Sequence, residues 1–171
     1  MSQVATSLDR QDANGLGTDH EQFLTFRLED EEYAVDILRV QEIRVWTPVT
    51  KIPNSPRYLK GVLNLRGTII PIIDLRTRFA LMERDYGPQT VVVILKVNSG
   101  DQTRVMGIVV DSVEETYAVD PASIHAAPHV GDVIDAEFIR GLISVDNKMI
   151  VLLDVDKLLN SAELAIDDLI E

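Results

Sequence analysis

Two aspartates occupy the same place in a repeated segment and are the first candidates for acid–base chemistry. Asp74 follows Gly61 by thirteen residues, and Asp154 follows Gly141 by the same number. Paired carboxylates act as general acid and base when a fold brings them together. Each aspartate also precedes a short segment typical of a helix, where an N-cap carboxylate accepts hydrogen bonds from free backbone N–H groups. Capping explains both copies equally, so we expect two caps and no catalytic residue.

The other reactive side chains form no recognisable site. His125 and His129 have an i, i+4 spacing, but Pro128 interrupts a helix there and no third zinc ligand lies nearby in the sequence. The acidic residues of segment 111–115 lack the alternation of a calcium loop. The chain contains no cysteine, no G-x-S-x-G and no GxxxxGK[ST] motif. We therefore expect no metal, no cofactor and no enzymatic activity.

Composition excludes several classes of partner. The 171 residues carry a net charge of −12, which argues against a binder of nucleic-acid backbones and against docking on anionic lipid. The hydrophobic share is 46%, sufficient for a core, but no apolar run reaches the length of about 18 residues that a membrane span needs. Residues 1–20 are polar and have no signal-peptide pattern, so we expect a disordered tail on a cytoplasmic protein.

A duplication organises the rest of the chain. Gly61–Phe79 (GVLNLRGTIIPIIDLRTRF) returns 80 residues later as Gly141–Leu159 (GLISVDNKMIVLLDVDKLL), with the apolar positions in register. Each copy predicts a β-hairpin followed by a short helix. The copies differ at the hairpin turn, where Arg66-Gly67 in the first is replaced by Asp146-Asn147 in the second. A difference inside a duplicated scaffold is a natural place for function.

Further strands are predicted outside the repeat: Phe23–Phe26, Tyr33–Val35, Thr90–Val97, Arg104–Val110 and Val113–Val119. Segment 36–46 fits a short helix or an extended bend. Many short strands and a two-fold repeat predict an all-β protein with short helices, built as two small five-stranded β-barrels packed together. The barrels should share a third apolar layer, and a cleft between them would be the natural docking site.

The predicted division of the chain follows the repeat. We expect one domain at 21–160, with barrel one at roughly 21–85 and barrel two at roughly 86–160. These boundaries are approximate and leave room for an exchange of strands between the barrels. Residues 161–171 are expected to form a C-terminal helix or tail.

Several segments together resemble the CheW family of chemotaxis coupling proteins. They are EEYAVDILRVQEI (Glu31–Ile43), YLKGVLNLRGTIIPIIDLR (Tyr58–Arg76), TVVVIL (Thr90–Leu95), VMGIVVDSV (Val105–Val113) and FIRGLISVDNKMIVLLDVDKLL (Phe138–Leu159). The resemblance implies two SH3-like barrels. It also implies a non-enzymatic scaffold that joins a CheA-type histidine kinase to the cytoplasmic tips of chemoreceptors, in the cytoplasm and at receptor arrays on the inner membrane.

The same resemblance implies which residues bind these partners. Receptor contact is implied for Val40, Glu42, Arg66, Ile69, Val91 and Val92, and kinase contact for Lys60 and Gly61. A guanidinium at the tip of a hairpin can hold a receptor carboxylate through two parallel hydrogen bonds. Adjacent strand residues point to opposite faces, so at most one of the two valines at 91 and 92 lines a groove. Core packing is the alternative for the aliphatic members, and a backbone bend is the alternative for Gly61.

Three other functions remain open from the sequence. The first is an adaptor of a non-chemotaxis receptor–kinase system, such as surface motility or second-messenger control. The second is a small-ligand-binding β-barrel, which predicts one large enclosed pocket. The third is an enzyme with Asp74 and Asp154 as an acidic dyad.

Overall fold

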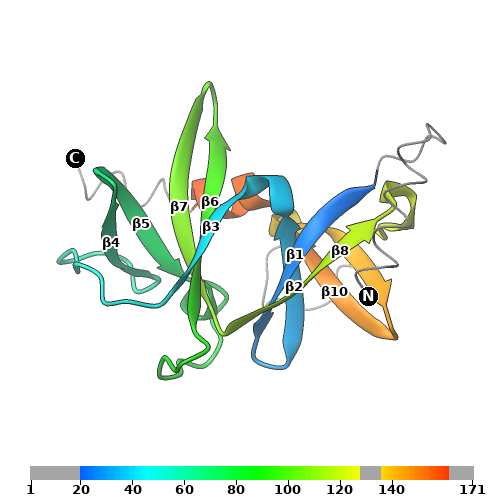
Figure 1. Cartoon of the computed structure of the whole chain (residues 1–171), viewed down its shortest axis with the longest axis horizontal. Coiled ribbons are helices and arrows are strands. Elements are labelled where there is room, and N and C mark those ends of the chain that lie inside the picture. The colour runs from blue at the N-terminus through cyan, green and yellow to red at the C-terminus, as the bar shows by residue number, and fades with distance from the viewer. Residues whose placement is uncertain (1–19, 128–135, 162–171) are drawn as a thin grey trace.

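Two five-stranded sheets lie side by side in the computed structural model, which describes residues 20–127 and 136–161 (Figure 1). Sheet A consists of β1 (Glu21–Leu28), β2 (Glu31–Asp36), β8 (Ser112–Val119), β9 (Ile139–Val145) and β10 (Lys148–Leu153). Sheet B consists of β3 (Val40–Val45), β4 (Leu59–Leu65), β5 (Thr68–Asp74), β6 (Val91–Ser99) and β7 (Gln102–Val110). The mainly β prediction, with two five-stranded units, is confirmed. The predictions for residues 1–19 and 162–171 fall outside the described part.

Helical segments in the described part are short. They are η1 (Ile37–Arg39), α2 (Leu75–Arg78), η2 (Pro121–Ser123), η3 (Ala136–Phe138) and a helical stretch at 155–161. Segment 36–46 contains both of the alternatives expected from its sequence, because the single turn η1 leads directly into β3. The short helix predicted after each hairpin is present, as α2 and as the stretch at 155–161.

The two halves of the chain exchange hairpins. Sheet A has the order β8-β1-β2-β10-β9, and sheet B has the order β3-β6-β7-β5-β4. The hairpin β1–β2 therefore joins strands of the second half, and β6–β7 joins strands of the first half. A division of the sheets near residue 86 does not occur, because the chain crosses between sheets after β2 and again after β7. In each sheet, the hairpin from the other half of the chain joins through a parallel strand pair. The pairs are β2 with β10 in sheet A and β5 with β7 in sheet B.

The duplication extends to individual hydrogen bonds. The N–H of Asp74 donates to the carbonyl oxygen of Tyr58 at 2.7 Å. The N–H of Asp154 donates to the carbonyl oxygen of Phe138 at 2.8 Å, which is the same bond 80 residues further along. Each bond fixes the start of a helix against the turn or the single helical turn that precedes the hairpin. The repeat seen in the sequence is therefore a repeat of local structure.

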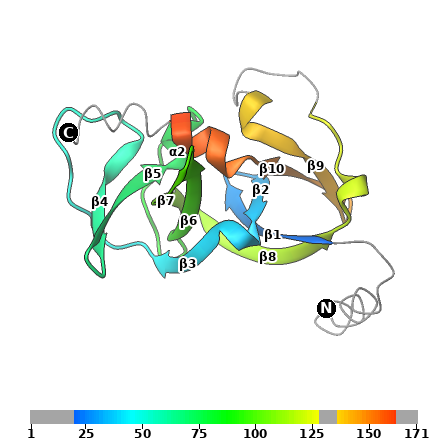
Figure 2. The same ribbon diagram turned by 90° about the horizontal axis from the view of Figure 1, so that it is seen from above.

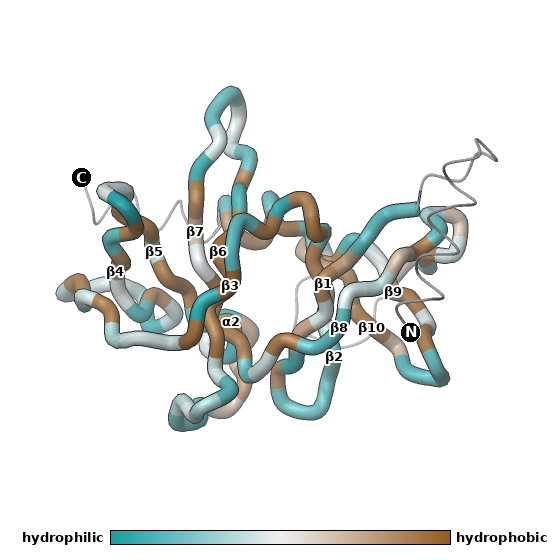
Figure 3. The backbone as a smooth tube through the Cα atoms, viewed as in Figure 1, coloured by the Kyte–Doolittle hydropathy of each residue, from teal (hydrophilic) through white to brown (hydrophobic). Residues whose placement is uncertain are grey.

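Three apolar clusters stabilise the molecule. One lies within sheet A around Phe23 and Leu152, and another lies within sheet B around Ile70 and Ile94. The third and largest is shared between the sheets and includes the helices. Figure 3 shows the apolar stretches of the strands converging where the sheets meet, and Figure 2 shows the helical residues 155–161 lying between them. The predicted third apolar layer is confirmed.

A candidate protein-binding surface on sheet B

The turn between β4 and β5 presents Arg66 to solvent. Arg66 and Gly67 have positive φ angles of 50° and 89°, the geometry of a primed two-residue hairpin turn. The N–H of Gly67 donates to Oδ1 of Asn64 at 2.9 Å, which fixes the turn from within. The side chain of Arg66 is 70% exposed, so the guanidinium stands at the hairpin tip as predicted.

Glu42 holds this guanidinium in place from the edge strand β3. Nη2 of Arg66 donates to Oε1 of Glu42 at 2.7 Å, and Nη1 of Arg44 lies 3.8 Å from the other carboxylate oxygen of Glu42. An ion pair this exposed contributes only about 0–1 kcal/mol to stability. The pair therefore orients Arg66 while costing little to open, and no local sequence signal could have found it across 24 residues.

Aliphatic side chains on the same sheet remain exposed. On β3, Ile43 is 44% exposed and Val45 is 67% exposed, and on β5 Ile69 is 56% exposed. Val45 lies directly opposite Val91 in the pairing of β3 with β6. The sequence analysis did not single out Ile43 and Val45. The alternation of polar and apolar residues along 42–45 is the signal that could have indicated this strand face.

The valines at 91 and 92 point to opposite sides, as predicted. Val92 is 3% exposed and packs inside sheet B with Leu65 and Ile70. Val91 and Val40 are half-buried and pack against the cluster between the sheets. Val92 thus has almost no free surface to offer a partner, whereas Val91 and Val40 border the junction of the sheets.

Lys60 and Gly61 lie on β4, the opposite edge of sheet B from β3. The side chain of Lys60 is 33% exposed, with Nζ 3.9 Å from Oδ2 of Asp74 and 5.7 Å from the ring centre of Tyr86. Gly61 has a φ of 152°, and a Cβ there would overlap the carbonyl group of Thr50. The close approach of Thr50 therefore explains why a glycine occupies position 61. Lys60, in contrast, exposes part of its side chain to solvent.

The aspartates of the repeat cap helices. Oδ1 of Asp74 accepts from the N–H of Arg76 at 2.9 Å, and Oδ1 of Asp154 accepts from the N–H of Lys157 at 3.0 Å. The Tyr86 hydroxyl donates to Oδ2 of Asp74 at 2.5 Å, and burial together with this bond raises the pKa of Tyr86. The two carboxylates follow strands of different sheets. This arrangement supports the capping interpretation over an acidic dyad.

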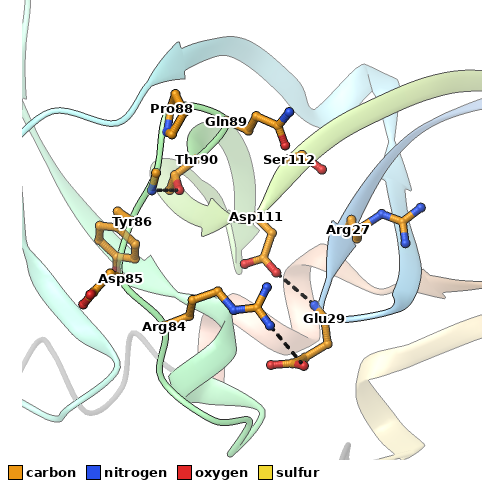
Figure 4. A pocket seen from close by; sticks show the side chains of 11 residues that line it. Arg27, Glu29, Arg84, Asp85, Tyr86, Pro88, Gln89, Thr90, Asp111 and Ser112 are labelled. Atoms are coloured by element: carbon orange, nitrogen blue, oxygen red, sulfur yellow. Dashed lines mark hydrogen bonds and ion pairs between the residues drawn. The ribbon is translucent and has the colours of Figure 1, made fainter.

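A hollow of about 370 Å³ lies at the seam of the two sheets and is lined by charged and polar groups (Figure 4). Three of its charged residues already have partners: Oδ2 of Asp111 accepts from the N–H of Glu29 at 2.9 Å, and Nη2 of Arg84 lies 3.7 Å from Oε2 of Glu29. This lining differs from the mainly apolar one typical of small-ligand pockets.

The described residues contain neither a metal-binding cluster nor a membrane-spanning helix. Across residues 20–127 and 136–161, no three His, Asp or Glu side chains gather where they could hold a metal ion. His125 forms a backbone bridge with Leu142, and His129 lies outside the described residues. No helix among the described residues has the length and apolar character to cross a bilayer.

Comparisons with known proteins agree with this geometry. The family model of the CheW-like domain matches residues 22–163. Chemotaxis protein CheW of Klebsiella aerogenes is 45% identical over 148 residues, which cover 86% of this chain and 87% of that protein. Protein FrzA of Myxococcus xanthus is 30% identical over 144 residues, covering 83% and 87%.

A solved structure gives the same result at the level of the fold. The crystal structure of the scaffolding protein TtCheW from Thermoanaerobacter tengcongensis has a TM-score of 0.74 and 33% identity to this chain. The similarity covers 84% of this chain and 90% of that one. With the family match over residues 22–163, these similarities show that the chain belongs to the family of proteins with a CheW-like domain.

Proposed function

We propose that this protein is a non-enzymatic scaffold that couples chemoreceptors to a CheA-type histidine kinase in bacterial chemotaxis. Relatives named chemotaxis protein CheW and a structural neighbour described as a scaffolding protein support the proposal. The observation that carries it is a set of exposed groups on sheet B: the ion pair of Arg66 with Glu42, and the aliphatic side chains of Ile43, Val45 and Ile69. These groups, hereafter the β3–turn surface, combine exposed apolar area with an oriented guanidinium.

A helical receptor tip suits this surface. An amphipathic helix docks by placing its apolar face on exposed apolar side chains while a few charges fix its orientation. Ile43, Val45 and Ile69 supply exposed aliphatic area, and Arg66 can give a receptor carboxylate two parallel hydrogen bonds. The weak, exposed pair with Glu42 keeps Arg66 extended before the receptor arrives. Val40 and Val91 contribute at the border of this contact, and the buried Val92 supports the strand from inside.

Kinase contact is proposed at the other end of β4. Lys60 lies near the start of this strand, beside Asp74 and Tyr86, whereas Arg66 follows its end. A scaffold has to bind two partners at once, so two separate contact regions are better suited than one shared site. Gly61 acts there through the backbone, because it lets β4 approach Thr50 closely. The protein would work in the cytoplasm and at receptor arrays on the inner membrane.

The receptor contact is tested by charge reversal at Arg66. We expect Arg66→Asp to weaken binding to a receptor cytoplasmic fragment by at least about ten-fold, because the oriented donor is lost and a like charge replaces it. Arg57→Asp is the matched control, since Arg57 is 80% exposed and forms a comparable surface ion pair with Glu83. Binding is measured by pull-down and calorimetry, with circular dichroism to verify the fold. Equal effects of the two substitutions would remove Arg66 from the site.

A second measurement separates the two partners. Lys60→Glu is expected to weaken binding to the kinase and to leave receptor binding unchanged, because Lys60 and Arg66 lie at opposite ends of β4. The purified protein should also neither bind nor hydrolyse nucleotide. Specific turnover that depends on Asp74 or Asp154 would instead favour the enzyme interpretation.

A further inference from the structure

The charge of this protein is distributed unevenly between the two sheets. Sheet B with its connections, residues 37–110, has 11 lysines and arginines against 5 acidic residues, a net charge of +6. The described segments that build sheet A, residues 20–36, 111–127 and 136–161, have 4 against 14, a net charge of −10. Two cations of sheet B, Arg39 and Arg76, form ion pairs across the junction with Asp156 and Asp111. The other cations of sheet B are free to act elsewhere.

The basic character is concentrated at the far end of sheet B. Residues 43–73 contain no aspartate or glutamate, although the chain has 28 of them. This segment consists of the end of β3, the loop that follows, β4 and most of β5. Figures 1 and 2 both show β4 at the end of the molecule away from sheet A. The five cations of the segment, hereafter the basic end, are Arg44, Lys51, Arg57, Lys60 and Arg66.

Nearby carboxylates balance the basic end only in part. Lys51 is exposed and has no acidic partner within the described part of the chain. Arg44 shares its carboxylate with Arg66. Three carboxylates therefore stand against five cations, in the pairs Arg66–Glu42, Arg57–Glu83 and Lys60–Asp74. An excess of positive charge remains at the surface.

The fold does not require a cation at the tip of this hairpin. Asp146 stands 80 residues after Arg66, at the same place in the repeat. Its turn also has two positive φ angles, 51° at Asp146 and 64° at Asn147. A hairpin of the same kind thus forms with the opposite charge at its tip, and exposed ion pairs add little to stability. A partner explains the basic end better than folding does.

A separation of charge of this kind controls how a charged partner approaches. The basic end attracts an acidic surface over about a Debye length, which is about 30 Å at 0.01 M salt and about 10 Å at 0.1 M. The acidic sheet A repels the same surface. An acidic partner is therefore turned toward the far end of sheet B before contact. Arg66, which orients a partner on the β3–turn surface, lies at that end.

We propose that the basic end steers an acidic helical partner onto the β3–turn surface, while the acidic sheet A keeps this partner from docking on the wrong side. The inference rests on the proposed function, in which the partner is the helical tip of a chemoreceptor. It adds the chemistry of that partner, an acidic surface beside its apolar contact face. It also gives Lys51 and Arg57 a role in association that requires no direct contact.

The sign of the salt dependence tests the proposal. The assay is stopped-flow kinetics of the full chain with a receptor cytoplasmic fragment of net negative charge. Two proteins of net negative charge repel, so without a steering patch salt should accelerate their association. With the basic end in control, the association rate constant should instead fall at least about three-fold between about 0.01 M and about 0.15 M salt. The dissociation rate constant should change much less, because steering acts before contact.

Two double variants of equal net charge locate the effect. Lys51→Gln/Arg57→Gln removes two cations from the basic end, and Lys148→Gln/Lys157→Gln removes two from the sheet A half. All four side chains are exposed, so circular dichroism should show the native fold for both variants. At low salt the first variant should associate about three-fold more slowly than wild type, and the second at close to the wild-type rate. Arg57→Asp should likewise slow association without changing dissociation, whereas Arg66→Asp should change both.

The outcomes separate steering from receptor binding itself. Equal association rates of the two double variants, or a wild-type association rate that rises with salt, would overturn the steering proposal and leave receptor binding intact. A wild-type protein that does not bind the fragment at either salt concentration would overturn the proposed function and steering with it.

Sedimentation with phosphatidylserine vesicles tests the other anionic surface that could occupy the basic end. We expect no binding of the full chain to these vesicles. Vesicle binding that is lost in Lys51→Gln/Arg57→Gln but retained in Lys148→Gln/Lys157→Gln would assign the basic end to anionic lipid, and would overturn the proposal.

Discussion

Replacing Arg76 by methionine is expected to cost more stability than any exposed charge in the described part of the chain. Arg76 is almost fully buried and donates to Asp111 through two bonds, to Glu29 and to the carbonyl oxygen of Met82. Methionine fills a similar volume but leaves those acceptors without their donor. The effect should therefore come from unpaired acceptors and much less from a cavity.

The size of the loss follows from burial. Removing one partner of a buried ion pair costs about 3–5 kcal/mol. The side chains of Asp111 and Glu29 are 22% and 33% exposed, and Glu29 keeps Arg84 at 3.7 Å, so water and Arg84 recover part of this. We expect a loss of about 2–3 kcal/mol, which corresponds to a decrease in Tm of about 5–10 °C for a chain of this length.

Urea unfolding followed by circular dichroism measures the loss, with Arg57→Met as the matched control. Arg57 and Glu83 are 80% and 56% exposed, so this control should change stability by less than about 0.5 kcal/mol. A double-mutant cycle with Asp111→Asn should give a coupling of about 2 kcal/mol. If Arg76→Met and Arg57→Met unfold at the same urea concentration, the claim that this network stabilises the junction is refuted.

Acid provides an independent check of the same network. The folded pKa of Asp111 is lowered from its ordinary value of 3.8. A lowered folded pKa stabilises the protein above the unfolded value, and this contribution disappears as the pH falls through the folded value. The stability difference between wild type and Arg76→Met should therefore be constant at neutral pH and should shrink as the pH falls below 3.8.

Two further predictions concern the duplicated hairpins. Gly61→Ala should destabilise the protein by more than about 2 kcal/mol, because its Cβ would meet the backbone of Thr50, whereas Gly67→Ala, with no atom within 4 Å, should cost only about 1 kcal/mol through its positive φ. Asp154→Ala should cost about 1 kcal/mol as the loss of an N-cap, and Asp74→Ala should cost more because the Tyr86 hydroxyl also loses its acceptor. Denaturant unfolding of the four variants checks both, and equal losses within either pair would contradict the structural explanation.

Local patterns allowed the sequence to predict the elements. The duplicated hairpins, the aspartate caps and the position of Arg66 at a turn depend on residues close together in the chain, and all three are present. Receptor and kinase contacts remain predictions from the family resemblance. Among the residues assigned to them, only Glu42 and Arg66 are brought together by a bond.

The pairing of strands that are distant in the sequence could not be predicted from local patterns. In the exchanged arrangement β2 pairs with β10 and not with β5, but these two strands have nearly the same apolar pattern because they are copies of each other. Arg39 and Asp156 form an ion pair although they are 117 residues apart. The sequence around a single arginine or aspartate does not indicate which residue it will pair with.

The order of strands along the chain also determines when each sheet can form during synthesis on the ribosome. Sheet B is built from residues 40–110 and can close as soon as β7 has emerged. The first hairpin, in contrast, must wait for β10, which ends at residue 153. At translation rates of about 5–20 residues per second, the inner edge of β2 stays without its neighbour for roughly 6–25 s. In the later part of that interval, after β7 has emerged, the nascent chain presents an open strand edge next to a finished sheet, and protection of this edge becomes a requirement of its biogenesis.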